Sequence, residues 1–224
     1  QYRRPGAPMQ AAYAGIQQEL LETAGADERS QVANTGWRGA VNAMGLKLAP
    51  GKRERSRREV YRRIRAPKDA MYSIAVLTLK GGAGKTTVTA ALGQVFSKVR
   101  ADGVIAVDAD PDAGDLAMRT AVHPQDLSMV DLLEPDNDLT QRDFVQRYLS
   151  VTDADLQVLA SGWRPDSDRV LIPEDIADIH EIASHYYSML LWDGDKALNS
   201  PLVRTVLEKS NALVLLVEAS APGA

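Results

Sequence analysis

Short, almost continuously apolar runs separated by helical patterns fill the chain from residue 71 onward. The runs lie at 72–79, 103–108, 155–161, 188–193 and 212–220, with helical patterns at 86–99, 126–134, 140–149, 173–186 and 200–210. Strands without polar alternation are typical of a sheet that is buried on both faces, with helices between parallel strands. We therefore predict an α/β fold in which a parallel sheet is flanked by helices. In such sheets ligands bind at the carboxyl ends of the strands.

A glycine-rich stretch, KGGAGKTT at 80–87, links the first apolar run to the first helical pattern. Its glycines allow backbone N–H groups to approach phosphate oxygens, and a helix N-terminus adds partial positive charge. In this context Lys85 is expected to reach the β- and γ-phosphates and Thr86 to offer its hydroxyl to Mg²⁺. This context predicts that Gly81, Gly82, Gly84, Lys85 and Thr86 bind the phosphates and Mg²⁺ of a nucleotide.

The stretch departs from the usual phosphate-loop pattern G-x-x-x-x-G-K-[ST], because Leu79 stands where the first glycine belongs and Lys80 follows it. The form K-G-G-x-G-K-T-T resembles the deviant Walker A loop of the ParA/MinD family of ATPases. In that family the first lysine reaches across a dimer interface to the ATP of the partner. The resemblance covers roughly residues 71–220. It implies a P-loop NTPase with ATP and Mg²⁺ as cofactors, an ATP-dependent homodimer, and a role for Lys80 in trans. The nucleotide-binding residues that it implies are Lys80, Gly81, Gly82, Ala83, Gly84, Lys85, Thr86 and Thr87.

Carboxylates follow two of the apolar runs, in VIAVDADPDAGDL at 104–116 and in SMLLWDGD at 188–195. The family resemblance implies that Asp108 lies near Mg²⁺, that Asp110 orients the water attacking the γ-phosphate, and that Asp193 holds Mg²⁺ from the Walker B position. Lys80, Lys85 and Asp110 are thus the expected catalytic residues, and Thr86, Asp108 and Asp193 the expected metal-binding ones. Gly114 is expected to let the loop rearrange on hydrolysis. A solvated acidic loop is the alternative interpretation of the first stretch.

Charge is divided unevenly along the chain, whose formal net charge is -4. Residues 1–70 hold 14 Lys and Arg against 7 Asp and Glu, whereas residues 71–224 hold 12 against 23. Nine basic residues fall within 52–68, which predicts contact with an anionic surface: DNA, lipid headgroups or an acidic partner protein. A solvated linker is the alternative.

Three parts are expected. Residues 1–35 are rich in Ala, Gln, Gly and Pro and are expected to be largely disordered. Residues 36–70 are expected to form a basic module with a helix that ends at Pro67 and places Val60, Tyr61 and Ile64 on one face. Residues 71–224 are expected to form the ATPase domain. Since members of the resembled family continue past the fifth strand, this domain is expected to be incomplete at its C-terminus, leaving an edge and a face of the run ALVLLV uncovered.

Composition excludes several classes of function. The chain has no cysteine, so disulfide frameworks, thiolate metal sites and cysteine nucleophiles are excluded, and a cytoplasmic location is favoured. Aromatic residues at 5% disfavour stacking on bases. No apolar run is long enough to span a bilayer, although peripheral attachment to a membrane stays open. HEIASH at 180–185 is one residue too long for the zinc motif H-E-x-x-H, which rejects a metalloprotease.

The expected function is that of a slow, Mg²⁺-dependent ATPase switch. GWR at 36–38, the Gly–Pro spacing and the basic helix look like MinD-like ATPases of actinobacteria associated with type VII secretion. This resemblance implies a secretion-system or positioning partner protein. The alternatives are a nucleotide-dependent adaptor without turnover and a DNA-partitioning protein that uses the basic arm.

Overall fold

The computed structural model describes residues 32–33, 36–45, 47–80, 82–112, 114–162 and 169–217. The chain divides into two compact units, residues 1–67 with 98–101 and residues 68–97 with 102–224. All but two residues of the segment 1–35 lie outside the described part. The prediction of disorder there stays a prediction.

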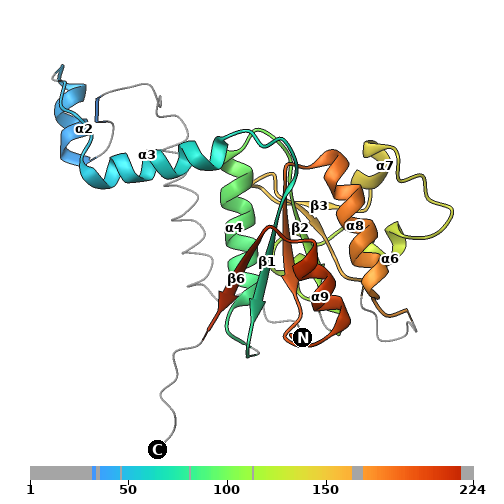
Figure 1. Cartoon of the computed structure of the whole chain (residues 1–224). Helices are drawn as coiled ribbons and strands as arrows, with labels where there is room; N and C mark the ends of the chain where they lie inside the picture. Colours follow the sequence, from blue (N-terminus) through green and yellow to red (C-terminus); the bar gives the residue numbers. More distant parts are fainter. Residues whose placement is uncertain are drawn as a thin grey trace, which may run out of the picture. The chain divides into compact units, whose positions relative to one another are not determined.

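The larger unit is built on a six-stranded sheet with the strand order β3-β4-β2-β5-β1-β6 (Figure 1). Its strands are β1 Tyr72–Thr78, β2 Val104–Ala109, β3 Ser150–Val151, β4 Gln157–Leu159, β5 Met189–Gly194 and β6 Ala212–Leu216. All neighbouring strands are parallel except β3 and β4. The predicted parallel α/β fold is confirmed. The antiparallel β3 was not predicted, because a strand of two residues leaves no apolar run.

Helices connect these strands. They are α4 Lys85–Val99, α5 Leu116–Arg119, α6 Met129–Leu132, α7 Arg142–Gln146, α8 Pro173–Tyr186 and α9 Pro201–Glu208. The structure shortens the helical pattern predicted at 126–134 to the four residues of α6. Asp126 has a φ of 55°, which no right-handed helix contains. At the other end, the Asn137 amide donates to the carbonyls of Asp131 and Leu132 and so ends the helix.

Two hydrophobic layers cover the two faces of the sheet. Alternate residues of β2 divide between them: Ile105 and Val107 pack on one side, Val104 and Ala106 on the other. Helices α6 to α9 supply the first layer and α4 with α5 the second, and Figure 1 shows α8 and α9 across the sheet from α4. This burial on both faces explains the near-continuous apolar runs. Trp192 is fully buried in the first layer, where its indole N–H donates to Ser73 Oγ at 3.0 Å.

The smaller unit contains α2 Gly36–Ala43 and α3 Lys52–Arg65. The Asn42 side chain stabilises the turn after α2 by donating to the carbonyls of Ala33 and Leu48 and accepting from the Leu48 N–H. In α3 the buried side chain is Glu54, paired with Arg58 at 2.6 Å. Val60 is 50% exposed, so the predicted apolar face of this helix is only partly covered.

The strand β6 pairs with β1 and has an exposed face within the described residues. Leu213 and Leu215 are 49% and 44% exposed, while the residues between them are half-buried. The strand therefore alternates between an exposed face and a half-buried face, and the exposed one is a face of the run ALVLLV. Among the described residues, no helix has the length and apolar character that crossing a bilayer requires.

Candidate functional site

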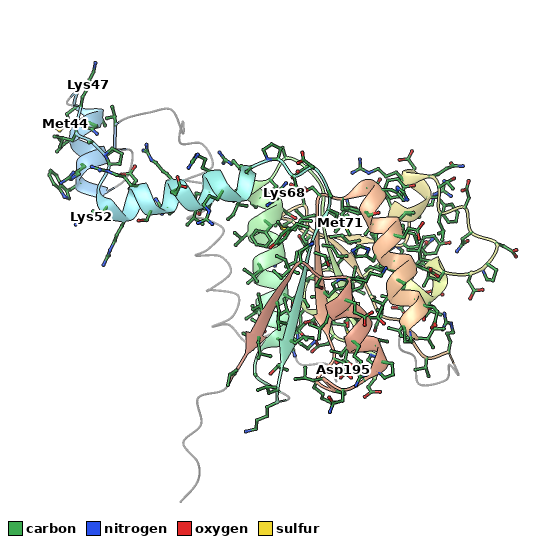
Figure 2. The ribbon with its side chains drawn as sticks, viewed as in Figure 1. Met44, Lys47, Lys52, Lys68, Met71 and Asp195 are labelled. Carbon is green, nitrogen blue, oxygen red and sulfur yellow. The ribbon has the colours of Figure 1, made fainter. Side chains whose placement is uncertain are left out.

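Three strand ends converge behind the glycine-rich loop. Asp193 near the end of β5 lies opposite Asp108 of β2 on one side and Val76 of β1 on the other. Because these strands are parallel, the two carboxylates and the loop after β1 share one edge of the sheet. Figure 2 shows Asp195, which follows β5, at this same end of the sheet.

The backbone conformation of the loop between β1 and α4 requires glycine at two positions. Gly82 and Gly84 have φ values of 85° and 88°, which residues with a Cβ rarely adopt. The helix α4 begins at Lys85, one residue before the predicted start, so its first N–H groups face the loop. Ala83, Thr86 and Thr87 are half-buried, and Gly81 lies outside the described residues. This loop and helix start can accept a phosphate group.

Asp193 is the centre of the side-chain cluster. Its Oδ1 lies 3.0 Å from Lys85 Nζ and 2.9 Å from Thr89 Oγ1. Its Oδ2 is buried without a hydrogen-bond partner among the described residues. Burial raises the pKa of this carboxyl, and Lys85, Thr86 and Thr89 partly offset the effect. A buried carboxylate oxygen without a partner is costly, so the site is suited to a ligand that contacts Oδ2.

Asp108 is buried beside Asp193. It accepts hydrogen bonds from two backbone N–H groups, that of Asp110 at 3.1 Å and that of Leu116 at 3.0 Å. Burial and the neighbouring Asp193 raise the pKa of Asp108 to about 7. A Cβ at position 114 would collide with the Asp108 carboxylate. Gly114 therefore has a packing role here, in addition to the expected role in rearrangement.

The donor set fits a hard divalent cation. Two buried carboxylates lie beside the Lys85 ammonium group, and Thr86 follows Lys85 at the start of α4. Mg²⁺ prefers oxygen ligands and keeps several of its waters, so it needs few protein groups when phosphates complete its shell. Within the described ranges, no three His, Cys, Asp or Glu side chains form a metal-binding group.

Lys80 and Asp110 lie at the rim of the site. Lys80 is exposed, and its backbone N–H donates to Thr78 Oγ1 at 3.3 Å. Asp110 is half-buried and accepts a hydrogen bond from the Asp112 N–H. Of the predicted site residues, Lys85 and Asp193 are therefore in direct contact, with Asp108 adjacent to Asp193 and Thr86 next to Lys85 in the chain.

Sequence reasoning missed Thr89. It lies one helical turn after Lys85, so its place on the same face of α4 could have identified it. Asp195 had no predicted role; it is buried, and its Oδ1 accepts the Lys196 N–H at 2.5 Å.

A parallel sheet, a glycine–lysine loop between β1 and α4, and acids at the ends of β2 and β5 define a phosphate-loop nucleotide-binding fold. The family described as CobQ/CobB/MinD/ParA nucleotide binding domain matches residues 74–209, more than half of the chain. The chain belongs to this family, and the resemblance to ParA/MinD proteins is confirmed.

Individual proteins that resemble the chain give a closer comparison than the family as a whole. The ESX-1 secretion-associated protein EspI of Mycobacterium tuberculosis, strains CDC 1551 / Oshkosh and ATCC 25618 / H37Rv, is 36% identical over 196 residues, covering 86% of this chain. The chain spans 29% of the length of that relative. The narrower resemblance to secretion-associated ATPases agrees with this match. A ParA family ATPase from Chlorobium tepidum TLS shares the fold, with a TM-score of 0.53, 22% identity, and coverage of 65% of this chain and 60% of that one.

Proposed function

We propose that the chain binds ATP with Mg²⁺, dimerises around it and hydrolyses it slowly, as a molecular switch. The observation that carries this proposal is the cluster of Lys85, Asp193 and Asp108 behind the glycine-rich loop, with Asp193 Oδ2 buried and unpartnered among the described residues.

Each side chain has a role in this proposal. Lys85 binds phosphate through those ammonium hydrogens that do not contact Asp193. Thr86, Asp108 and Asp193 hold Mg²⁺, which neutralises charge on the phosphates when bound. Asp110 orients the attacking water. Lys80, exposed at the rim, contacts the nucleotide of the partner subunit.

The cellular role that we propose is a switch for type VII secretion or intracellular positioning, acting in the cytoplasm or at a membrane surface. The similarity to a relative named as an ESX-1 secretion-associated protein supports secretion over the other processes that use this fold. The proposed partner is a secretion-system protein, which the nucleotide state would engage or release.

The arginines of α3 favour a second candidate, a nucleotide-dependent adaptor or DNA-partitioning protein that does not depend on turnover. Eight of the fourteen residues of this helix are basic. A helix of this charge can bind DNA phosphates or an acidic protein.

Phosphate release and nucleotide binding, measured together, separate the two candidates. The switch predicts Mg²⁺-dependent turnover that chelation of the metal abolishes, and nucleotide binding without turnover in Asp110→Ala. Lys85→Ala should lose binding and turnover together, while Lys209→Ala, at the far end of α9, controls for the loss of a lysine. Tight binding with no phosphate release above background would favour the adaptor.

A further inference from the structure

A groove with a volume of about 670 Å³ lies between α8 and the segment that joins α6 to α7. Leu139, Ile182 and Tyr186 form apolar parts of its wall, and Glu134, Asp178 and Glu181 add three carboxylates. The Tyr186 hydroxyl donates to the Leu139 carbonyl at 3.1 Å, which joins the two walls. The groove is therefore part of the folded unit, with an acidic rim around an apolar wall.

The groove is separate from the nucleotide site. The helix α8 precedes β5, so its C-terminal half approaches the amino edge of the sheet. The glycine-rich loop and Asp193 lie at the opposite, carboxyl edge. An occupant of the groove would therefore leave the nucleotide site accessible.

Charge restricts what the groove can hold. Among the residues that the structure describes, no Lys or Arg lines it. The segments 131–138 and 174–181, which flank it, hold eight Asp and Glu and no Lys or Arg. Glu134, Asp178 and Glu181 are exposed, and within the described part of the chain none of them forms an ion pair. Such a surface favours a basic segment that carries an apolar side chain and disfavours nucleic acid or an anionic membrane.

The chain itself contains a segment of this chemistry. The helix α3 has eight basic and two acidic residues, and its Val60 is 50% exposed. Arg57 and Arg63 lie three residues on either side of Val60 and therefore share its face of the helix. An apolar side chain between arginines complements an apolar wall between carboxylates.

We propose that this groove is the docking site for α3 of a second copy of the chain. The two parts of the sequence have opposite net charge, so copies attract each other through different surfaces. The contact forms without nucleotide and goes beyond the ATP-dependent dimer proposed above.

The test measures self-association of the full chain by sedimentation equilibrium, without nucleotide, in a Lys85→Ala background that prevents nucleotide-driven pairing. We expect concentration-dependent association that weakens as salt rises. Asp178→Lys with Glu181→Lys should weaken it about tenfold or more, because arginines would then face lysines. Glu208→Lys, an exposed acid on α9 outside the groove, is the matched control and should change nothing.

Exchanging the charges of the two proposed surfaces tests whether α3 and the groove contact each other. Arg57→Glu with Arg63→Glu should weaken association by itself and should restore it in the chain that carries the two lysines, while circular dichroism verifies that every variant is folded. The proposal would be overturned if the chain stays monomeric, or if the groove substitutions leave its self-association unchanged. If α3 binds duplex DNA and the groove substitutions have no effect on self-association, its partner is nucleic acid and the proposal is wrong. Lost ATP binding would leave this result unaffected, so the two proposals fail separately.

Discussion

At the scale of single residues, the site depends on how one carboxylate is held. Thr89 and Lys85 both contact Asp193 Oδ1, which leaves Oδ2 for a ligand. The fully buried Thr89 hydroxyl also lies 3.1 Å from the Lys85 carbonyl. Thr89 therefore links the start of α4 to the end of β5.

Thr89→Val removes this link at nearly constant volume. Asp193 Oδ1 keeps Lys85 as a donor and loses the hydrogen bond from Thr89, which should lower the free energy of unfolding by about 0.5 to 1.5 kcal/mol. Thr205→Val is the matched control, since the exposed Thr205 hydroxyl bonds only the Pro201 carbonyl, one turn back in α9. Chemical denaturation of both variants gives the comparison. Equal losses would show that the Asp193 contact contributes nothing to stability.

Asp108 should give the nucleotide-free, metal-free protein a distinct pH dependence. Its folded pKa is raised from 3.8 to about 7, so between these values the folded state holds a proton that the unfolded state has lost. The contribution of Asp108 to the free energy of unfolding is therefore fully present below pH 3.8 and is lost above pH 7. Between these values it falls as pH rises, by at most about 1.4 kcal/mol per pH unit. Denaturation at several pH values should show a slope that Asp108→Asn reduces, whatever its effect on absolute stability, while the raised pKa of Asp193 contributes to the slope that remains. Identical slopes in both proteins would contradict the assignment.

At the scale of elements, the sheet presents β6 as a half-exposed strand. Leu213 and Leu215 lie on its exposed face, and an exposed apolar edge strand promotes aggregation.

Leu213→Thr with Leu215→Thr should raise the concentration at which the chain stays monodisperse, with little change in stability, because threonine keeps a high strand propensity. Val214→Thr, on the more buried face, should lower stability without improving solubility. Light scattering and thermal unfolding measure the two effects. Unchanged aggregation in the double variant would show that another surface is responsible.

Long elements were predictable and short ones were not. The helix α8 has the predicted bounds, because its 14 residues carry a clear pattern and Pro173 marks its start. The helices α6 and α7 contain four and five residues and depend on turns between them that no periodicity reveals. The loop at 80–87 was predictable from local sequence, whereas the acidic groove was not, because packing brings residues 133–140 against α8.

At the scale of the whole molecule, the chain contains a nucleotide-binding domain of a known family and, before it in the sequence, the basic helix α3. The proposed switch uses the carboxyl edge of the sheet, and the proposed docking groove uses α8 and the segment before α7. The two proposals predict two kinds of self-association, one dependent on ATP and one on salt. In each, a lysine or arginine of one copy meets an anionic group of another.

The central claim is that two copies of the chain dimerise around ATP. Substitution of Lys80 tests this claim most directly, because Lys80 is the residue that we assign to the nucleotide of the partner subunit. The measurement is light scattering with ATP and Mg²⁺ at a salt concentration that suppresses charge-driven association, in an Asp110→Ala background that we expect to prevent hydrolysis. A charge-assisted contact to phosphate contributes about 1.5 to 3 kcal/mol, so Lys80→Ala should weaken the ATP-dependent dimer tenfold or more while nucleotide binding is retained. Equal ATP-dependent dimerisation with and without Lys80→Ala would contradict the account.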